Sequence, residues 1–230
     1  MANDENIVGW FTSNGKHIPL REGESKEEAL KRSFDKKERE ISRTQEESDE
    51  LNSKESDTDT NFNKAEPKDF VKSLHSAKAS RPIVDKWRVD EHTAEEIVER
   101  GGKCFVSKGG STVVVDKDGD IISVCKAMGD RSIHGSDLLQ IAVKAGGVKL
   151  DSFYGNNGFY CANGFQPVCY TPFNEKYAPD GWRESGCGQE PVVFYRYVGI
   201  GRVKNTDITK LPVFTGDDGY EMAQKYRDSH

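Results

Sequence analysis

The sequence predicts an α+β fold: a central mixed, mostly antiparallel sheet flanked by helices, preceded by an acidic hairpin and helix leader. Three observations support this prediction. Three short runs rich in β-branched residues follow one another between residues 103 and 126, separated by glycine-containing turns. The spacing of apolar residues then changes from the strand period to the helical period before strand-like runs return. Only 34% of the residues are hydrophobic, and the polar excess lies mainly in the N-terminal part.

Acidic charge is concentrated at the start of the chain. Residues 1–66 hold 11 Lys and Arg against 17 Asp and Glu, whereas residues 67–230 hold 22 of each sign. Broad nucleic-acid-binding surfaces are basic, so direct nucleic-acid binding is not expected. No apolar run approaches the roughly 18 residues of a membrane span. The N-terminus lacks the basic and apolar regions of a secretory signal, so neither membrane insertion nor signal-directed secretion is expected.

The cysteines point to an intracellular protein with reduced thiols. There are five of them, an odd number, and no two have Cys-x-x-Cys spacing. A disulfide framework or a zinc site is therefore not predicted, and no metal is expected.

The leader shows a hairpin pattern followed by a helix pattern. Residues 7–20 alternate apolar and polar side chains around an Asn-Gly pair at 14–15, which favours a type I′ turn. Ser25 and Glu28 have the spacing of a capping box, which predicts a helix to about residue 51. The polar residues that follow it predict a disordered linker.

These patterns divide the leader into a hairpin segment at 1–24 and a charged helix with its linker at 25–66. An isolated two-stranded hairpin is only marginally stable in water. The hairpin is therefore expected either to dock on a partner or to be unstructured in free solution, and residues 1–51 are the expected contact with a host or virion protein.

The folded body is expected to begin near Pro67 with helical elements. Residues 69–79 place apolar side chains on one helical face, and Thr93 with Glu96 forms a second capping box before a short helix. Between these helices, residues 87–89 have the composition of a strand.

The first half of the predicted sheet is a three-stranded antiparallel meander. Its strands are expected at 103–107, 112–116 and 120–126, joined by Gly-Gly and Asp-Gly turns. A helix capped by Ser136 follows. Because that helix connects two strands, it implies one parallel pair in the sheet.

The second half of the sheet is expected from three later strands. The strands are expected at 148–153, 165–170 and 191–199. A short helix is expected around 159–162, a long loop at 171–190, and an edge strand and helix within 201–230. The loop contains Phe173, Tyr177 and Trp182 between prolines and glycines, which predicts a rigid aromatic flap. It could bind a ligand, but covering a sheet edge is the favoured interpretation.

Several segments of the body resemble the GNAT superfamily of N-acetyltransferases. A Tyr-x-x-x-Gly-Phe pattern runs from Tyr160 to Phe165, and in that family it precedes the last two strands. The runs GGSTVVVDKDGDIISVCK, GSDLLQIAVKAGGVKLD and EPVVFYRY are similar to GNAT-like proteins of bacteriophages and Firmicutes prophages. The resemblance implies a GNAT-like domain over residues 67–200. The shorter segment GWFTSNGKHIPL resembles parts of phage head-morphogenesis products.

The resemblance implies a place for acetyl-CoA. In the family, a Gln/Arg-x-x-Gly-x-Gly/Ala loop turns backbone N–H groups toward the CoA pyrophosphate at a helix N-terminus. Gly135 matches the second glycine, but Ile133 stands at the first and Asp130 at the basic position. Both retained and lost CoA binding therefore remain open. The residues implied in binding are Val124, Cys125, Lys126, Arg131, His134, Gly135 and Ser136.

The resemblance also implies catalytic candidates. Tyr160 stands where many GNAT enzymes keep a tyrosine that protonates the departing thiolate, and the alternative is a core aromatic residue. Glu184 is a candidate general base, and Asp151 is another residue that could approach the acceptor side. Nothing in the sequence selects between these two carboxylates.

Two functions from different classes follow. The favoured one is a phage-encoded, non-enzymatic or degenerate GNAT-fold protein in the host bacterial cytoplasm or in the virion. It would contact a host or virion protein through residues 1–51 and the 171–190 loop. The alternative is an acetyl-CoA-dependent N-acetyltransferase that acts on a protein or a small-molecule amine.

Overall fold

The computed structural model describes residues 7–13, 16–26, 28–29, 60–186, 188–204 and 206–230. By its internal contacts the chain divides into two units, Met1–Asp57 and Thr58–His230. Each unit is described by itself.

The first unit contains the predicted hairpin. Strands β1 (Ile7–Ser13) and β2 (Lys16–Arg21) pair antiparallel, with Ser13 opposite Lys16. The residues of the turn at 14–15 lie outside the described residues. The capping box is also confirmed: the Ser25 N–H donates to Glu28 Oε2 at 2.8 Å, and the Glu28 N–H donates to Ser25 Oγ at 3.3 Å. The predicted continuation of this helix to residue 51 falls outside the described residues.

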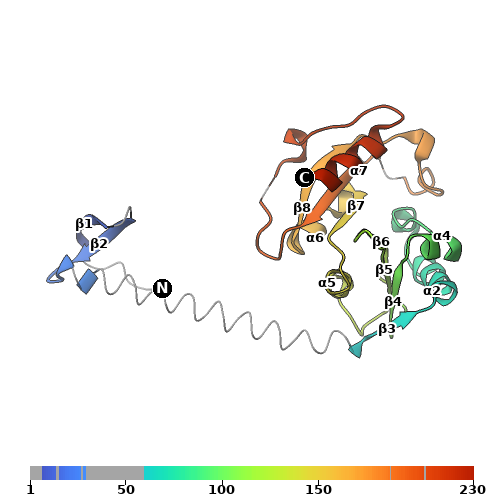
Figure 1. Cartoon of the computed structure of the whole chain (residues 1–230), viewed down its shortest axis with the longest axis horizontal. Helices are drawn as coiled ribbons and strands as arrows, with labels where there is room; N and C mark the ends of the chain where they lie inside the picture. The colour runs from blue at the N-terminus through green and yellow to red at the C-terminus, as the bar shows by residue number, and fades with distance from the viewer. Residues whose placement is uncertain (1–6, 14–15, 27, 30–59, 187, 205) are drawn as a thin grey trace. The chain divides into compact units, whose positions relative to one another are not determined.

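The second unit begins with a four-stranded antiparallel sheet in the order β3-β4-β5-β6 (Figure 1). Its strands are β3 (Phe62–Ala65), β4 (Lys103–Ser107), β5 (Thr112–Val115) and β6 (Ile121–Cys125). The predicted meander is therefore confirmed. The prediction of a linker up to residue 66 is wrong for its last part, because β3 pairs with β4 there and the body begins before Pro67.

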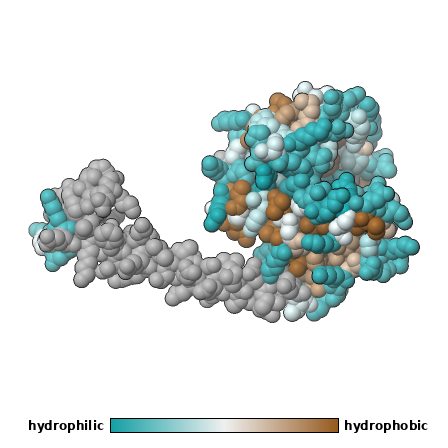
Figure 2. All heavy atoms as spheres, in the orientation of Figure 1, coloured by the Kyte–Doolittle hydropathy of each residue, from teal (hydrophilic) through white to brown (hydrophobic). Residues whose placement is uncertain are grey.

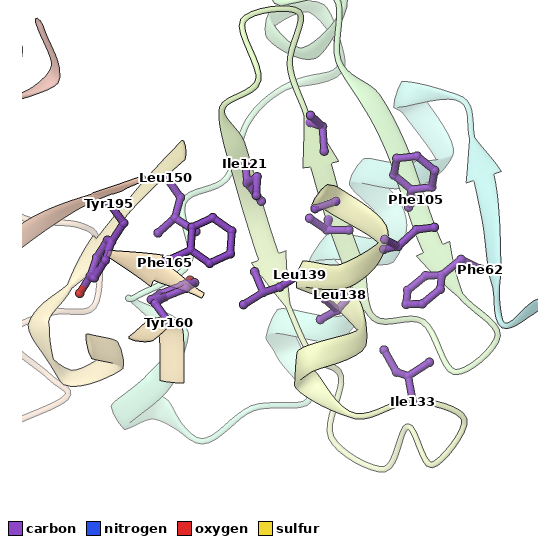
Figure 3. Close-up of a cluster of buried hydrophobic side chains, with 14 of the residues drawn as sticks. Phe62, Phe105, Ile121, Ile133, Leu138, Leu139, Leu150, Tyr160, Phe165 and Tyr195 are labelled. Atoms are coloured by element: carbon purple, nitrogen blue, oxygen red, sulfur yellow. The ribbon is translucent and has the colours of Figure 1, made fainter. Parts of the chain in front are cut away.

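Helices cover both faces of this sheet. Helices α2 (Pro67–Ala79) and α4 (Ala94–Glu99) bury Phe70, Leu74 and Ile97 against one face. The Thr93 capping box is confirmed. Helix α5 (Gly135–Lys144) packs on the other face, as Figure 3 shows for Leu138 and Leu139. With helices on both sides, all four residues of β5 are buried.

The strand predicted at 87–89 is wrong. Helix α3 (Ile83–Lys86) occupies this region, and Trp87 takes a helical backbone conformation at its C-terminal end. Only 1% of the Trp87 surface is exposed, and its ring lies 4.5 Å from that of Phe153. The aromatic residue that suggested a strand therefore serves tertiary packing instead.

A three-stranded antiparallel sheet in the order β7-β9-β8 forms the rest of the unit. Its strands are β7 (Lys149–Phe153), β8 (Phe165–Thr171) and β9 (Val192–Tyr197), with α6 (Asn157–Ala162) between β7 and β8. The predicted edge strand is reduced to one bridge between Tyr170 and Val213 and a short 3-10 helix at Ile208–Lys210. Helix α7 (Gly219–Ser229) then packs on β8 and β9 (Figure 1).

The two sheets meet at one point and then diverge. A parallel bridge joins Asp120, just before β6, to Lys149 at the start of β7. The predicted parallel pairing is therefore present, but only as this bridge. Beyond it the two strands belong to separate sheets.

One hydrophobic core runs beneath this junction. Figure 3 shows Ile121 of β6 and Leu150 of β7 near one another, with Phe165, Tyr160 and Tyr195 continuing the core into the second sheet. On the face in Figure 2, hydrophobic residues form small groups interrupted by hydrophilic ones. The core therefore fixes where β6 and β7 separate.

Candidate active site at the divergence of two strands

A cleft of about 410 Å³ lies where β6 and β7 diverge. Side chains from both strands line it, together with residues of α5, α6 and α7. Its carboxylates include Asp120 and Asp151, and Tyr160 also lines it. Because a concave site with a few convergent polar groups is where ligands usually bind, this cleft is the first candidate site.

Strand β6 contains a β-bulge where it borders the cleft. The pairing between β5 and β6 shifts register here, and Ser123 has a φ of 52°. This conformation is uncommon for a residue other than glycine. The Ser123 carbonyl accepts a hydrogen bond from Thr112 Oγ1 at 3.2 Å, and Ser123 Oγ lies 3.2 Å from His92 Nδ1. Bulges redirect side chains and backbone groups, and they are common next to active sites.

Two of the three residues implied in binding at the C-terminal end of β6, counting Lys126 just after it, reach the cleft. Val124 and Lys126 line it. Cys125 does not, because it points to the opposite face of the sheet and is buried with the side chains of α2 and α4. Burial raises the pKa of its thiol, so Cys125 is an inert core residue. The prediction that Cys125 helps to bind CoA is therefore not supported by its placement.

The loop before α5 is organised around a buried carboxylate. Asp130 accepts hydrogen bonds from the hydroxyls of Ser107 and Ser111, both at 2.5 Å, and from the Ser132 N–H at 2.9 Å. Burial opposes ionisation, but these hydrogen bonds hold the pKa of Asp130 well below its usual value. Asp130 thus ties the loop to the β4–β5 turn. It does so in the position where the family pattern has a basic or amide residue.

We expect Asp130→Ala to lower the free energy of unfolding by about 3 kcal/mol, because it leaves buried hydroxyl donors without their acceptor. Urea denaturation measures this change. Asp180→Asn removes an exposed carboxylate elsewhere and serves as the control. A loss below about 0.5 kcal/mol in Asp130→Ala would show that the hydrogen bonds are not what holds the loop.

The start of α5 offers backbone donors next to basic side chains. His134 is the N-cap residue, and its N–H donates to Asp137 Oδ2 at 2.7 Å. The prediction of Ser136 as the cap is therefore wrong by two residues. Gly135 lines the cleft with Lys126, whose ammonium donates to the Asp130 carbonyl at 2.6 Å. The first N–H groups of a helix have no acceptor within it, so this end of the cleft favours an anion.

Arg81 adds a second cation at this end. It lines the cleft and donates from Nη1 to the Lys126 carbonyl at 3.0 Å. Its Nε is buried and has no hydrogen-bond partner among the described residues. Arg81 Nη2 also lies 3.4 Å from Asp85 Oδ2, and Asp85 lines the same cleft. With Lys126 and the helix end, Arg81 makes this end of the cleft suitable for an anionic group. Arg131 and His134 are exposed in the same loop and do not line the cleft.

Asp151 is the carboxylate with the most unusual environment in the cleft. It lies on β7, and 21% of its side chain is exposed. Burial, followed by the negative charge of Asp120, raises the pKa of Asp151 to about 7. Tyr220 lines the same cleft, and burial followed by the charge of Asp151 raises the pKa of its hydroxyl. A carboxylate with this pKa can accept a proton from an ammonium ion near neutral pH and release it to water.

Tyr160 is a largely buried phenol at the same site. Its surface is 7% exposed, and its ring packs against Phe159, Phe165 and Tyr195. Burial raises the pKa of Tyr160 to about 12, so the hydroxyl stays protonated across the physiological range. It belongs both to the core and to the cleft wall. The two readings of Tyr160 from the sequence, proton donor and core aromatic, are therefore compatible.

A buried arginine from the C-terminal helix joins the two sheets below the cleft. Arg227 is 0% exposed and contacts Asp120 with two nitrogens, at 3.2 and 2.7 Å. Its Nη1 also lies 3.8 Å from Asp151 Oδ1, and its Nε donates to Asp228 at 2.9 Å. Arg227 thus neutralises charge on both sides of the divergence between β6 and β7.

A second cleft, of about 370 Å³, borders the first. The two clefts meet at five residues that line both of them: Arg88, Asp90, Asp151, Ser152 and Tyr220. Phe173 and Tyr177 from the 171–190 loop form part of the second cleft. The loop therefore contributes to a cavity, and it does not serve only as a cover.

The structure brings some of the predicted site residues together and separates others. Tyr160, Val124, Lys126 and Gly135 line the first cleft. Ser136, on the first turn of α5, does not line it. Glu184 is exposed and lines neither cleft. Of the two candidate bases, only Asp151 is at the site.

Three contributing residues were not found from the sequence: Arg81, Tyr220 and Arg227. Arg227 is 107 positions from Asp120, and no motif connects the two. The only sequence signal for Arg227 is that a charged residue stands among the apolar positions of the C-terminal helix.

Comparisons with protein-family models, with curated proteins and with solved structures give no match to this chain. Within the part of the chain that the structure describes, no group of three or more His, Cys, Asp or Glu is arranged to hold a metal ion. No helix there is long and apolar enough to cross a bilayer.

Proposed function

We propose that the protein is an acyl-CoA-dependent N-acyltransferase of the GNAT type, with acetyl-CoA as the expected donor. The observation that carries the proposal is the position of Asp151. It lies between two clefts, and its pKa is about 7. Further support comes from the separation of two strands after a single parallel bridge, with basic and backbone donors at one end of the opening.

The residues of the first cleft suit a CoA thioester. Lys126, Arg81 and the first turn of α5 would hold the phosphates. The bulged β6 backbone near Val124 would face the carbonyl, where an N–H group can stabilise developing negative charge. CoA, once bound, supplies an activated acyl group with a thiol leaving group. All other roles fall to side chains and backbone N–H groups of this protein.

The reaction needs two proton transfers. Asp151 takes one proton from the ammonium form of the acceptor, so that a neutral amine nitrogen can form the bond to the carbonyl carbon. The carbon–sulfur bond then breaks, and the second amine proton ends on the departing sulfur. Tyr160 lies on the cleft wall where it can donate this proton and recover one from the nitrogen.

The experiment is an assay of thiol release from acetyl-CoA with a panel of primary amines. We expect amine-dependent release, and Tyr160→Phe should lower kcat by about ten- to a hundred-fold, because proton donation to sulfur is lost. Tyr154→Phe removes the hydroxyl of an exposed tyrosine that lines neither cleft and is the matched control. Equal rates with and without protein across the panel would contradict the proposal.

One observation favours a second candidate, a non-enzymatic GNAT-fold protein of phage origin that binds a host or virion protein. The loop before α5 departs from the family pattern: Ile133 is a buried core residue where a glycine is expected, and Asp130 is committed to serine hydroxyls. This candidate predicts no binding of acetyl-CoA. It also predicts capture of a partner that requires residues 1–51 or the 171–190 loop.

A further inference from the structure

We propose that the second cleft binds a primary ammonium ion carried on an apolar, preferably aromatic, stem, with the ammonium group directed toward Asp151. As an assignment of the acceptor, this inference rests on the proposed acyltransfer. As an assignment of a ligand site, it can be tested without acyl-CoA.

The walls of the cleft are apolar and aromatic. Phe153 and Val192 come from the second sheet, while Phe173 and Tyr177 come from the 171–190 loop. The Phe173 ring is braced by Trp182 at 4.5 Å, and Trp182 is itself 9% exposed with its indole N–H bonded to the Gly188 carbonyl at 3.3 Å. A braced aromatic wall of this kind favours an apolar group of matching size.

The charged groups of the cleft are mainly acidic. Asp90, Asp151, Asp217 and Glu221 line it, against one cation, Arg88. That cation is already paired with carboxylates outside the cleft lining: it lies 3.2 Å from Asp85 and contacts Glu190. Asp217 and Glu221 also have partners outside the lining, Lys176 at 3.0 Å and Lys225 at 3.9 Å, so Asp90 and Asp151 carry most of the negative charge open to a ligand. That charge attracts a positive ligand and opposes a carboxylate.

The position of Asp151 sets the orientation of the ligand. Asp151 and Ser152 are shared by both clefts, whereas Phe173 and Tyr177 belong only to the second. A ligand that fills the aromatic part with its stem therefore presents its ammonium end to Asp151. This arrangement accounts for a carboxylate at the junction and for aromatic residues away from it.

Tryptophan fluorescence of the full-length protein is a suitable measurement. Trp87 contacts Phe153 and Trp182 contacts Phe173, so both indoles lie next to cleft residues. The probes are 2-phenylethylamine, the neutral 2-phenylethanol and the anionic 3-phenylpropanoate, without acetyl-CoA. Nα-acetyl-lysine amide forms a further arm, which distinguishes a small arylalkylamine from the side chain of a protein substrate.

We expect the amine to bind at least about tenfold more tightly than the alcohol, and the carboxylate to bind most weakly. Asp90→Asn should weaken amine binding about two- to fivefold, because it removes an exposed carboxylate of the lining. Phe173→Ala should weaken it about tenfold. Asp180→Asn removes an exposed carboxylate of the same loop that does not line the cleft, and should leave the affinity unchanged.

Alcohol or carboxylate binding as tight as that of the amine would overturn the inference, and so would the absence of a fluorescence change at millimolar amine. Amine binding without any binding of acetyl-CoA would refute the acyltransferase and leave the ammonium site standing. Tighter binding of the lysine derivative than of 2-phenylethylamine would overturn the preference for an aromatic stem and point to a lysine side chain as the source of the ammonium group.

Discussion

Replacing Arg227 with alanine is expected to lower the free energy of unfolding by about 3–5 kcal/mol. Arg227 is fully buried, and its guanidinium holds Asp120, whose side chain is 7% exposed. Removal of the guanidinium leaves a buried carboxylate without its counter-ion, which is the costly way to break such a pair. Urea denaturation followed by circular dichroism measures the change.

Two comparisons separate this effect from a general loss of charge. Arg183→Ala removes an arginine whose side chain is 75% exposed and paired with Glu175 on the surface, so stability should change by less than about 0.5 kcal/mol. The double substitution Arg227→Met with Asp120→Leu removes both charges and should recover most of the stability. If Arg227→Ala costs less than about 1 kcal/mol, the arginine is not the clamp between the two sheets.

Asp151→Asn is expected to reduce acyl transfer by about 10²- to 10⁴-fold, because asparagine cannot accept the ammonium proton. In the parent protein kcat/KM should rise with pH through about 7, where Asp151 becomes ionised, and Tyr160 should remain protonated throughout this range. The pH profile of thiol release measures both features. Glu184→Gln should leave the profile unchanged, because Glu184 is exposed outside both clefts.

The same substitution should stabilise the fold above neutral pH. The pKa of Asp151 is higher in the folded protein than in the unfolded chain, so the folded state binds the extra proton between about pH 4 and pH 7. The contribution of this group to stability therefore falls as pH rises through that window. At pH 8 Asp151→Asn removes the cost of a buried charge, which we expect to raise the free energy of unfolding by about 2–4 kcal/mol.

These two effects of Asp151→Asn have opposite signs, and that combination is diagnostic. A residue that only supports the fold would lose activity and stability together. Lower stability of Asp151→Asn at pH 8, or transfer within twofold of the parent, would remove Asp151 from its role as the base.

Local sequence patterns predicted the local structure well. The meander at 103–125, the two capping boxes and the helix before β7 follow from β-branched runs, Asp-Gly and Gly-Gly turns, and apolar periodicity, all of which act over a few residues. The strand predicted at 87–89 is wrong because the burial of Trp87 depends on Phe153, which is distant in the chain. Strand β3 was missed because its partner β4 begins about 40 residues later and its own four residues carry a weak pattern.

The candidate site was only partly predictable, because local patterns do not record contacts between residues that are distant in the chain. Lys126, Gly135 and Tyr160 lie in segments that resemble a family, so the resemblance could place them. The choice between Asp151 and Glu184 depended on which carboxylate is buried beside Asp120 and Tyr220, and sequence spacing does not record that. Asp130 shows the opposite case, in which a departure from the family pattern is explained by hydrogen bonds to serines 19 and 23 positions away.

We propose that the cleft between β6 and β7 binds an acyl-CoA. Titration calorimetry of the full-length protein with acetyl-CoA tests it most directly, with Gly135→Glu as the variant that places a carboxylate at the phosphate end of the cleft. We expect micromolar binding that is lost in Gly135→Glu. The absence of heat and of a thermal shift at millimolar acetyl-CoA would contradict it.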